Sequence, residues 1–306
     1  MKLTEILNSD NIDLVLVDTS IQDDDNFGWD IYESTKYSSL DVESLTKEIA
    51  VVMQVKGVLE NPKTRTIKAV TKEFRSFEQV INNKIKAFSE GYLPKNKKIK
   101  IKIKKRDNEP RYKLELLQEE AYETRMLSQA KELKVEDNNY ELLLNMIKLI
   151  EPVIKIKRDM GFVYGFHEKD RARTSDTDER LTAALYWLSL FSGKSSCLIT
   201  KDQDFASLSS IIPGLIGSGY FLPYNEFFRK RIIENPFRIY KKDREINGEF
   251  KLAIDSSLTH YNRWFSVKNA STRKNWLIKD DIARMWREFN PSIGHEYQTA
   301  LVSQYA

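Results

Sequence analysis

The alternation of apolar and polar segments along the first part of the chain predicts an α/β protein. Residues 14–17 (LVLV) form a continuous apolar run, which is typical of a central strand buried on both faces of a parallel sheet. Apolar residues then recur at helical spacing over 42–59. Residues 66–70 (TIKAV) predict a short strand, and Thr71 resembles the N-cap of a helix that continues through the EFRSFEQVINNKIKAF segment.

The middle of the chain has a different pattern. Lysine alternates with isoleucine over 95–106, which predicts a strand, and YKLELL at 112–117 predicts the strand that returns beside it. A polar helix is expected at about 117–134, followed by an apolar helix at about 142–150. We therefore expect a basic β-hairpin with helices, inserted into the α/β fold.

The last part of the chain again alternates helix and strand. A helix is predicted over 178–191, a stop at Gly193 and a strand over 196–200. Two further strands, FRIYKK and EFKLAI, flank an Asn-Gly pair and predict a hairpin. The strands of the first and last parts lack period-2 patterning, which favours a central parallel sheet.

These patterns divide the chain into three parts. An α/β domain is expected over 1–91 and 150–222, the basic hairpin and helical insertion over 92–149, and an α+β extension over 223–306.

Composition narrows the class of protein only slightly. The 306 residues include 49 Lys plus Arg and 45 Asp plus Glu, and the net charge of +4 is too small to identify a polyanionic partner. The single cysteine, Cys197, excludes a disulfide within the chain and suits a reducing compartment. Because no apolar run reaches membrane-spanning length and no secretory signal is evident, we expect a cytoplasmic protein. The three histidines lack the spacing of zinc ligands.

Two predicted strands end on carboxylates. Asp18 directly follows LVLV, while Asp202 and Asp204 follow SCLIT. Because parallel strands end at one edge of a sheet, where ligands bind, these acids are expected to lie close together. Carboxylates at such a short separation repel one another unless a cation lies between them. Mg²⁺ prefers oxygen ligands of this kind.

Two helices supply further candidate acids. Asp178 stands three residues before Leu181 in the apolar stripe of its helix, so it is expected on the buried side of the helix start. The alternative is an ordinary helix-start carboxylate, favoured by the helix dipole. Glu73 follows the proposed cap at Thr71, but a shift of the helix frame by one residue would favour Glu78 instead.

The succession of LVLVDTS, a helix-borne Glu, SDTDERLTAALYWLS and LITKDQDF resembles the PIN-domain nucleases. This resemblance covers about residues 10–90 and 150–222. It implies a three-layer α/β/α fold with a central parallel sheet. The middle insertion is longer than in compact members of the family, and the resemblance does not extend to the C-terminal part, about residues 224–306.

The resemblance implies hydrolysis of phosphodiester bonds, usually in RNA, with Mg²⁺ or Mn²⁺. Asp18, Asp178, Asp202 and Glu73 would be the catalytic acids, with Asp18, Asp178, Asp202 and Asp204 holding metal. Ser20 and Thr200 are candidates to hydrogen-bond a ligand carboxylate or a phosphate. An alternative from another class is a PIN-like scaffold with little activity, which would bind nucleic acid or a protein partner.

Basic residues outside these motifs are candidates for substrate binding. Alternation over 95–106 would place four lysines on one strand face, where they could follow a phosphate backbone; they are Lys98, Lys100, Lys102 and Lys104. The same lysines could equally protect an edge strand from aggregation. Arg171 and Arg173 precede Asp178 and are candidates to contact phosphates, or else belong to a solvated loop.

Other phosphate and nucleotide sites are disfavoured because the residues that they need are missing. No Walker motif occurs, and GLIGSG at 214–219 has its glycines in the wrong order for a dinucleotide fingerprint. A haloacid-dehalogenase-type site needs an Asp two positions after the first, where this chain has Ser20.

Overall fold

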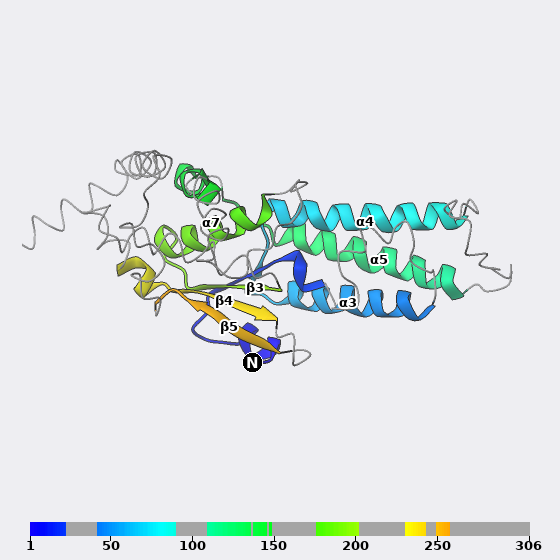
Figure 1. Ribbon diagram of the computed structural model, residues 1–306, viewed down its shortest axis with the longest axis horizontal. Coiled ribbons are helices and arrows are strands. Elements are labelled where there is room, and N and C mark those ends of the chain that lie inside the picture. The colour runs from blue at the N-terminus through cyan, green and yellow to red at the C-terminus, as the bar shows by residue number, and fades with distance from the viewer. Residues whose placement is uncertain are drawn as a thin grey trace, which may run out of the picture. The chain divides into compact units, whose positions relative to one another are not determined.

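The computed structural model describes residues 1–22, 42–89, 109–135, 137–145, 147–148, 176–201, 230–242 and 249–257. The chain forms two compact units. The first contains the described residues of 1–16 and of 134–257, and the second contains those of 17–133. The fold is of the α/β class, as predicted (Figure 1).

Five strands form one mixed sheet in the order β2-β1-β3-β4-β5. The strands are β1 (Leu14–Val17), β2 (Thr64–Arg65), β3 (Ser196–Thr200), β4 (Phe237–Lys242) and β5 (Phe250–Asp255). The pair β3–β4 is parallel and the pair β4–β5 is antiparallel. The predicted hairpin of 237–254 is confirmed, but β4 lies directly beside β3, so this hairpin extends the sheet that β1 and β3 begin.

Strands β1 and β3 begin side by side. The backbone N–H groups of Asp13 and Leu14 donate to the carbonyl of Ser195, at 2.9 and 3.2 Å. The N–H of Ser195 donates in turn to Oδ2 of Asp13, at 2.9 Å. Since the two strands are neighbours in the sheet and begin together, they run in the same direction and end at the same edge. Both strands are apolar and buried along nearly their whole length, as predicted.

Helix α7 (Thr177–Leu190) packs on β3 and β4 and is confirmed at almost its predicted bounds. The rings of Tyr186 and Phe237 meet edge to face, with centroids 4.8 Å apart. Ser189 Oγ donates to the carbonyl of Asn235 at 2.6 Å. The predicted stop is also confirmed, because Gly193 has a φ of 61°, which a glycine adopts without strain.

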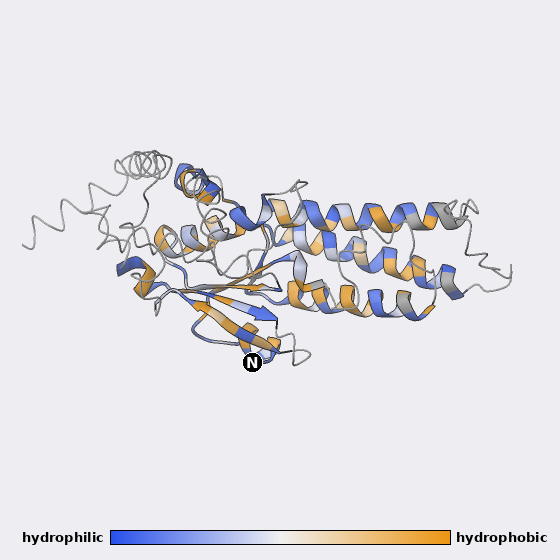
Figure 2. Ribbon diagram, in the orientation of Figure 1, coloured by the Kyte–Doolittle hydropathy of each residue, from blue (hydrophilic) through white to orange (hydrophobic). Residues whose placement is uncertain are grey.

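The second unit is built around three long helices that lie side by side in Figure 1. They are α3 (Val42–Glu60), α4 (Lys68–Ser89) and α5 (Glu109–Ala130). Helix α5 packs against both others through a shared apolar core; its members are Leu45, Ile49, Val52, Ile81, Leu114, Leu117 and Ala121. Figure 2 shows apolar and polar residues alternating along these helices, as expected where one face is buried. The prediction of a helix over 42–59 is confirmed.

Two predictions in this unit are wrong. The return strand at 112–117 is part of α5, because Leu114, Leu117 and Ala121 recur at helical spacing and fill the bundle core. A hairpin between 95–106 and 112–117 is therefore excluded. The strand predicted at 66–70 is also wrong, since β2 ends at Arg65 and α4 begins at Lys68. Thr71 is consequently not an N-cap, and its N–H already donates to the carbonyl of Ile67 at 3.0 Å.

Shorter elements complete the described structure. Residues 138–145 and 147–148 are helical, close to the helix predicted at 142–150. Helix α1 (Leu3–Leu7) follows Met1, whose backbone pairs with that of Phe250. Among the described residues, no helix is long and apolar enough to cross a membrane.

Candidate active site

Asp18 directly follows β1 and is buried, with 4% of its surface exposed. It precedes a short 3-10 helix, η1 (Thr19–Gln22), and the N–H of Ile21 donates to its carbonyl at 3.4 Å. The hydroxyl of Ser20 donates to Oδ2 of Asp18, so the expected hydrogen bond from Ser20 to a candidate carboxylate is present. A buried carboxylate held at the end of a strand has a fixed orientation, which a metal ligand needs.

Glu73 contacts the residue that follows Asp18. The hydroxyl of Thr19 donates to Oε2 of Glu73, which lies on the second turn of α4 and is half-buried. Glu73 is thus hydrogen-bonded to the residue directly after Asp18. The sequence alone suggested Ser20 as a supporting hydroxyl but missed Thr19, because this contact joins positions 54 residues apart.

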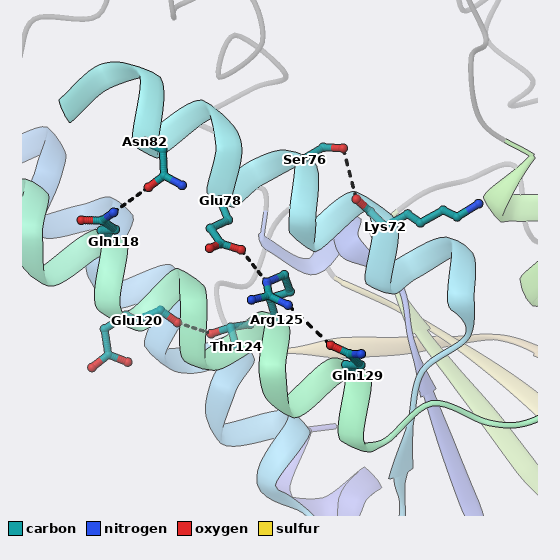
Figure 3. Close-up of polar contacts among 9 residues, drawn as sticks. All are labelled: Lys72, Ser76, Glu78, Asn82, Gln118, Glu120, Thr124, Arg125 and Gln129. Atoms are coloured by element: carbon teal, nitrogen blue, oxygen red, sulfur yellow. Dashed lines mark hydrogen bonds and ion pairs between the residues drawn. The ribbon is translucent and has the colours of Figure 1, made fainter. Parts of the chain in front are cut away.

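Glu78, the alternative to Glu73, has a different partner. Its Oε2 accepts a hydrogen bond from Nε of Arg125 on α5 at 2.5 Å, with 16% and 18% of the two side chains exposed (Figure 3). A charge-assisted pair of this kind is a structural contact between helices. The geometry therefore favours Glu73 as the helix-borne acid near Asp18.

A row of polar contacts fixes how α4 faces its neighbours. Beyond the Glu78–Arg125 pair, Nε2 of Gln118 donates to Oδ1 of Asn82 at 2.7 Å (Figure 3). On the other side of α5, Lys56 of α3 pairs with Glu120 at 2.9 Å and with Glu123. These contacts join α5 to both other helices of the bundle.

Asp178 lies in the first turn of α7, as predicted, and is half-buried. The expectation that it occupies the buried side is only partly met, since the next residue, Glu179, is more deeply buried at 2% exposure. Almost every position of α7 is buried, so the apolar stripe could not distinguish one face from the other. The helix dipole would stabilise a negative charge on Asp178 and on Glu179 alike, because both lie in the first turn of α7.

Asp176, which sequence reasoning missed, directly precedes α7 and forms two ion pairs. Its carboxylate accepts hydrogen bonds from Nε of Arg180 at 2.7 Å and from Nζ of Lys148 at 2.5 Å. Burial on its own raises the pKa of Asp176, but these two bonds outweigh it and lower the pKa to about 2. The same pairing raises the pKa of Arg180. Asp176 is thus a structural acid, two residues from the candidate Asp178.

Several predicted site residues lie outside the described part of the chain. They are Asp202, Asp204, Lys98, Lys100, Lys102, Lys104, Arg171 and Arg173. Thr200, the last residue of β3, is described and fully buried. Within the described ranges, no three His, Cys, Asp or Glu residues gather as a metal site would require. Comparison of the chain with protein-family models, with curated proteins and with solved structures found no match.

Asp18 and Glu73 are the described residues of this region that could hold a hard cation. Asp18 and Glu73 offer carboxylate oxygens, and Ser20 and Thr19 each donate to one of them. Oxygen ligands oriented by hydroxyl groups are the donor set that Mg²⁺ and Mn²⁺ prefer.

Proposed function

We propose that the protein is a divalent-metal-dependent nuclease with a PIN-like three-layer α/β/α fold, most simply an endoribonuclease. The observation that carries this proposal is the buried carboxylate of Asp18, which stands at the end of β1 and is held there by Ser20. Ligands of open α/β sheets bind beyond the carboxyl ends of the strands, where Asp18 lies. The resemblance of LVLVDTS, TDERLTAAL and LITKDQDF to PIN-domain motifs points to the same chemistry.

The order of the strands supports the proposal. Strands β1 and β3 are neighbours that begin together, so the chain leaves both of them at one edge of the sheet. Asp18 follows β1 by one residue and Asp202 follows Thr200 by two. We therefore propose Asp18 and Asp202 as the principal metal ligands, with Asp178, Glu73 and Asp204 completing the acidic group.

The proposed acids and the two hydroxyl groups would have different roles in metal binding and catalysis. Mg²⁺ or Mn²⁺, when bound, would neutralise phosphate charge and lower the pKa of a coordinated water. The carboxylates of Asp18 and Asp202 would supply the oxygen ligands that such a hard cation prefers. Ser20 orients Asp18, and Thr19 orients Glu73 at the start of α4. A half-buried glutamate that is positioned in this way is suited to accept a proton from an attacking water.

The proposal is tested by incubating single-stranded and hairpin RNA with the protein in Mn²⁺, Mg²⁺ or EDTA. We expect cleavage that EDTA abolishes and that Asp18→Asn and Asp202→Asn each reduce by about 100-fold or more. Glu78→Gln is the matched control, since it removes an acid from the same helix as Glu73 but one that Arg125 holds. Cleavage that persists in Asp18→Asn would reject the metal assignment.

A thermal-unfolding titration with Mn²⁺ separates the nuclease from an inactive scaffold. A ligand that binds only the folded state raises the melting temperature, and above its Kd the shift grows with the logarithm of the ligand concentration. We expect Mn²⁺ to raise the melting temperature of the wild type and of Glu78→Gln, but not that of Asp18→Asn. RNA binding without either cleavage or a Mn²⁺-dependent shift would instead identify a nucleic-acid-binding scaffold.

A further inference from the structure

The exposed side chains of α4 that the structure describes are all basic or amide groups. They are those of Lys68, Lys72, Arg75, Gln79, Asn83 and Lys86. At about 100° per residue these positions fall within an arc of roughly 80°, so they form one stripe along the helix. At the rise of an α-helix the stripe is about 27 Å long. We call these six residues the α4 stripe.

The other two helices of the bundle do not share this charge. The exposed charged residues of α3 are Glu43, Lys47 and Glu60, and those of α5 are Glu109, Arg111, Glu115 and Glu119. Two of their cations are already paired, since Lys47 contacts Glu43 at 2.8 Å and Arg111 contacts Glu115 at 2.9 Å. The outer faces of α3 and α5 are thus mixed or acidic, whereas the α4 stripe has four cations and no anion. An ordinary solvated helix face would carry both signs, as α3 does.

The cations nearest the start of α4 are available for a ligand. Lys68, Lys72 and Arg75 form no ion pair with any other residue that the structure describes. The acids of α4 point elsewhere: Glu73 accepts from Thr19 and Glu78 pairs with Arg125. In Figure 3 the side chain of Lys72 extends away from the contacts between α4 and α5.

A membrane surface fits the α4 stripe poorly. A helix that binds lipid buries its apolar face among the acyl chains. The apolar face of α4 is already used, because Val70, Phe74 and Ile81 are buried in the protein. What remains for a partner is charge and amide hydrogen bonding, which match a phosphate backbone.

We propose that the α4 stripe binds the phosphate backbone of the RNA that the protein cleaves; this inference rests on the proposed nuclease function. The stripe starts on the same two turns of α4 as Glu73, which Thr19 ties to the residue after Asp18. A strand lying along the stripe would therefore lead from the bundle to the candidate active site. Lys68, Lys72 and Arg75 contact the phosphates closest to Glu73, and the amides of Gln79 and Asn83 extend the track.

The test measures the affinity of the full chain for a fluorescein-labelled single-stranded RNA in EDTA, by fluorescence anisotropy at about 50 to 200 mM salt. We expect Lys72→Glu/Arg75→Glu to raise Kd at low salt by about tenfold or more. The slope of log Kd against log salt should fall by about 1.4, because each lost phosphate contact on a single strand removes about 0.7. The neutral variant Lys72→Gln/Arg75→Gln should show the same fall in slope, and circular dichroism checks that both variants fold.

The matched control is Lys47→Glu/Arg111→Glu, which changes the net charge equally on the outer faces of α3 and α5. It should alter Kd by less than about twofold, because these exposed i,i+4 pairs are not on the stripe and contribute little to stability. If the control weakens binding as much as the stripe variants do, only net charge matters and the proposal is overturned. Binding to phosphatidylserine vesicles but not to RNA would also overturn it.

A cleavage assay in Mn²⁺ on the same variants distinguishes the two proposals. If cleavage requires Asp18 but the stripe variants bind RNA with unchanged affinity and salt slope, the α4 stripe proposal is rejected and the nuclease proposal stands. RNA binding that depends on the stripe, without any metal-dependent cleavage, would support the stripe and reject the nuclease.

Discussion

The hydroxyl of Thr19 donates a hydrogen bond to Oε2 of Glu73 and so ties the residue after Asp18 to helix α4. The contact joins a strand end to a helix that begins about 50 residues later. It distinguishes Glu73 from Glu78, which lies on the same helix but faces Arg125.

Glu73 and Glu78 should respond differently to the same substitution. We expect Glu73→Gln to lower RNA cleavage by about 100-fold or more, because a positioned carboxylate near the attacking water is lost. Glu78→Gln should leave cleavage within a few-fold of wild type. Initial rates at saturating Mn²⁺ measure both variants. Equal losses in the two variants would contradict the distinction drawn from Thr19.

The pair of Arg125 and Glu78 should stabilise the bundle. Both side chains are largely buried, at 18% and 16% exposure, so the loss of either partner leaves a poorly solvated charge. We expect Arg125→Ala to lower the free energy of unfolding by about 2 kcal/mol. Part of this loss comes from the contact of its guanidinium with the ring of Tyr122, whose centroid lies 5.1 Å away.

Urea denaturation of both single variants and of the double variant with Glu78→Ala gives the coupling energy of the pair. A coupling energy near zero would show that the pair contributes nothing. The exposed pair of Arg111 and Glu115 provides the comparison, since it should couple by less than about 0.5 kcal/mol.

Two glycines should respond to alanine with opposite signs. Gly193 has a φ of 61°, so Gly193→Ala should destabilise the protein by about 1 kcal/mol. Gly57 lies inside α3, and a Cβ there would meet no atom within 4 Å. Gly57→Ala should therefore stabilise by about 1 kcal/mol, because alanine has the higher helix propensity. Thermal unfolding of both variants checks the signs, and a stabilising Gly193→Ala would be incompatible with the observed turn.

Asp176 should make the stability of the protein depend on pH in the acid range. Its pKa is lowered to about 2, so the folded state binds this proton less readily than the unfolded chain. The resulting stabilisation is present above the ordinary carboxyl pKa of about 4 and is lost as pH falls from about 4 to about 2. Asp176→Asn should reduce the slope of stability against pH in that window.

An NMR titration of the carboxyl carbon of Asp176 reports the same effect directly. In Lys148→Met the pKa of Asp176 should move up toward its ordinary value, because one of the two hydrogen bonds that lower it is gone. An ordinary pKa already in the wild type would show that the Arg180 and Lys148 contacts do not form in solution.

Sequence periodicity correctly predicted the elements whose apolar pattern fits either a strand or a helix but not both. The runs LVLV and SCLIT are too short and too uniformly apolar to be amphipathic helices, and they are β1 and β3. The helices over 42–59 and 178–191 also have nearly their predicted bounds. YKLELL fits both periods, since Tyr112, Leu114 and Leu116 alternate while Leu114 and Leu117 lie on one helical face. The segment is helical in the structure because a helix buries Leu114 and Leu117 in the core that α5 shares with α3 and α4.

For the candidate site, the sequence suggested the acids but could not show their surroundings. The place of Asp18 at a strand end could be predicted because a carboxylate after an apolar run is a local pattern. The hydrogen bond from Thr19 to Glu73 and the pairing of Asp176 with Lys148 join residues 54 and 28 positions apart. Contacts at that separation depend on how the helices are placed. The difference between Glu73 and Glu78 and the structural role of Asp176 therefore follow from the tertiary structure and not from any local sequence pattern.

The parallel ladder of β3 and β4 limits how the chain can be shortened. The N–H of Ser196 donates to the carbonyl of Pro236 at 3.1 Å, and the ladder continues from the pair Ser196–Phe237 to the pair Thr200–Lys241. A fragment that ends near residue 222 would lack β4, so β3 would become an edge strand. An exposed apolar edge strand can pair with another copy of the chain and promote self-association. Expression fragments that are meant to stay monomeric should therefore extend at least through β5.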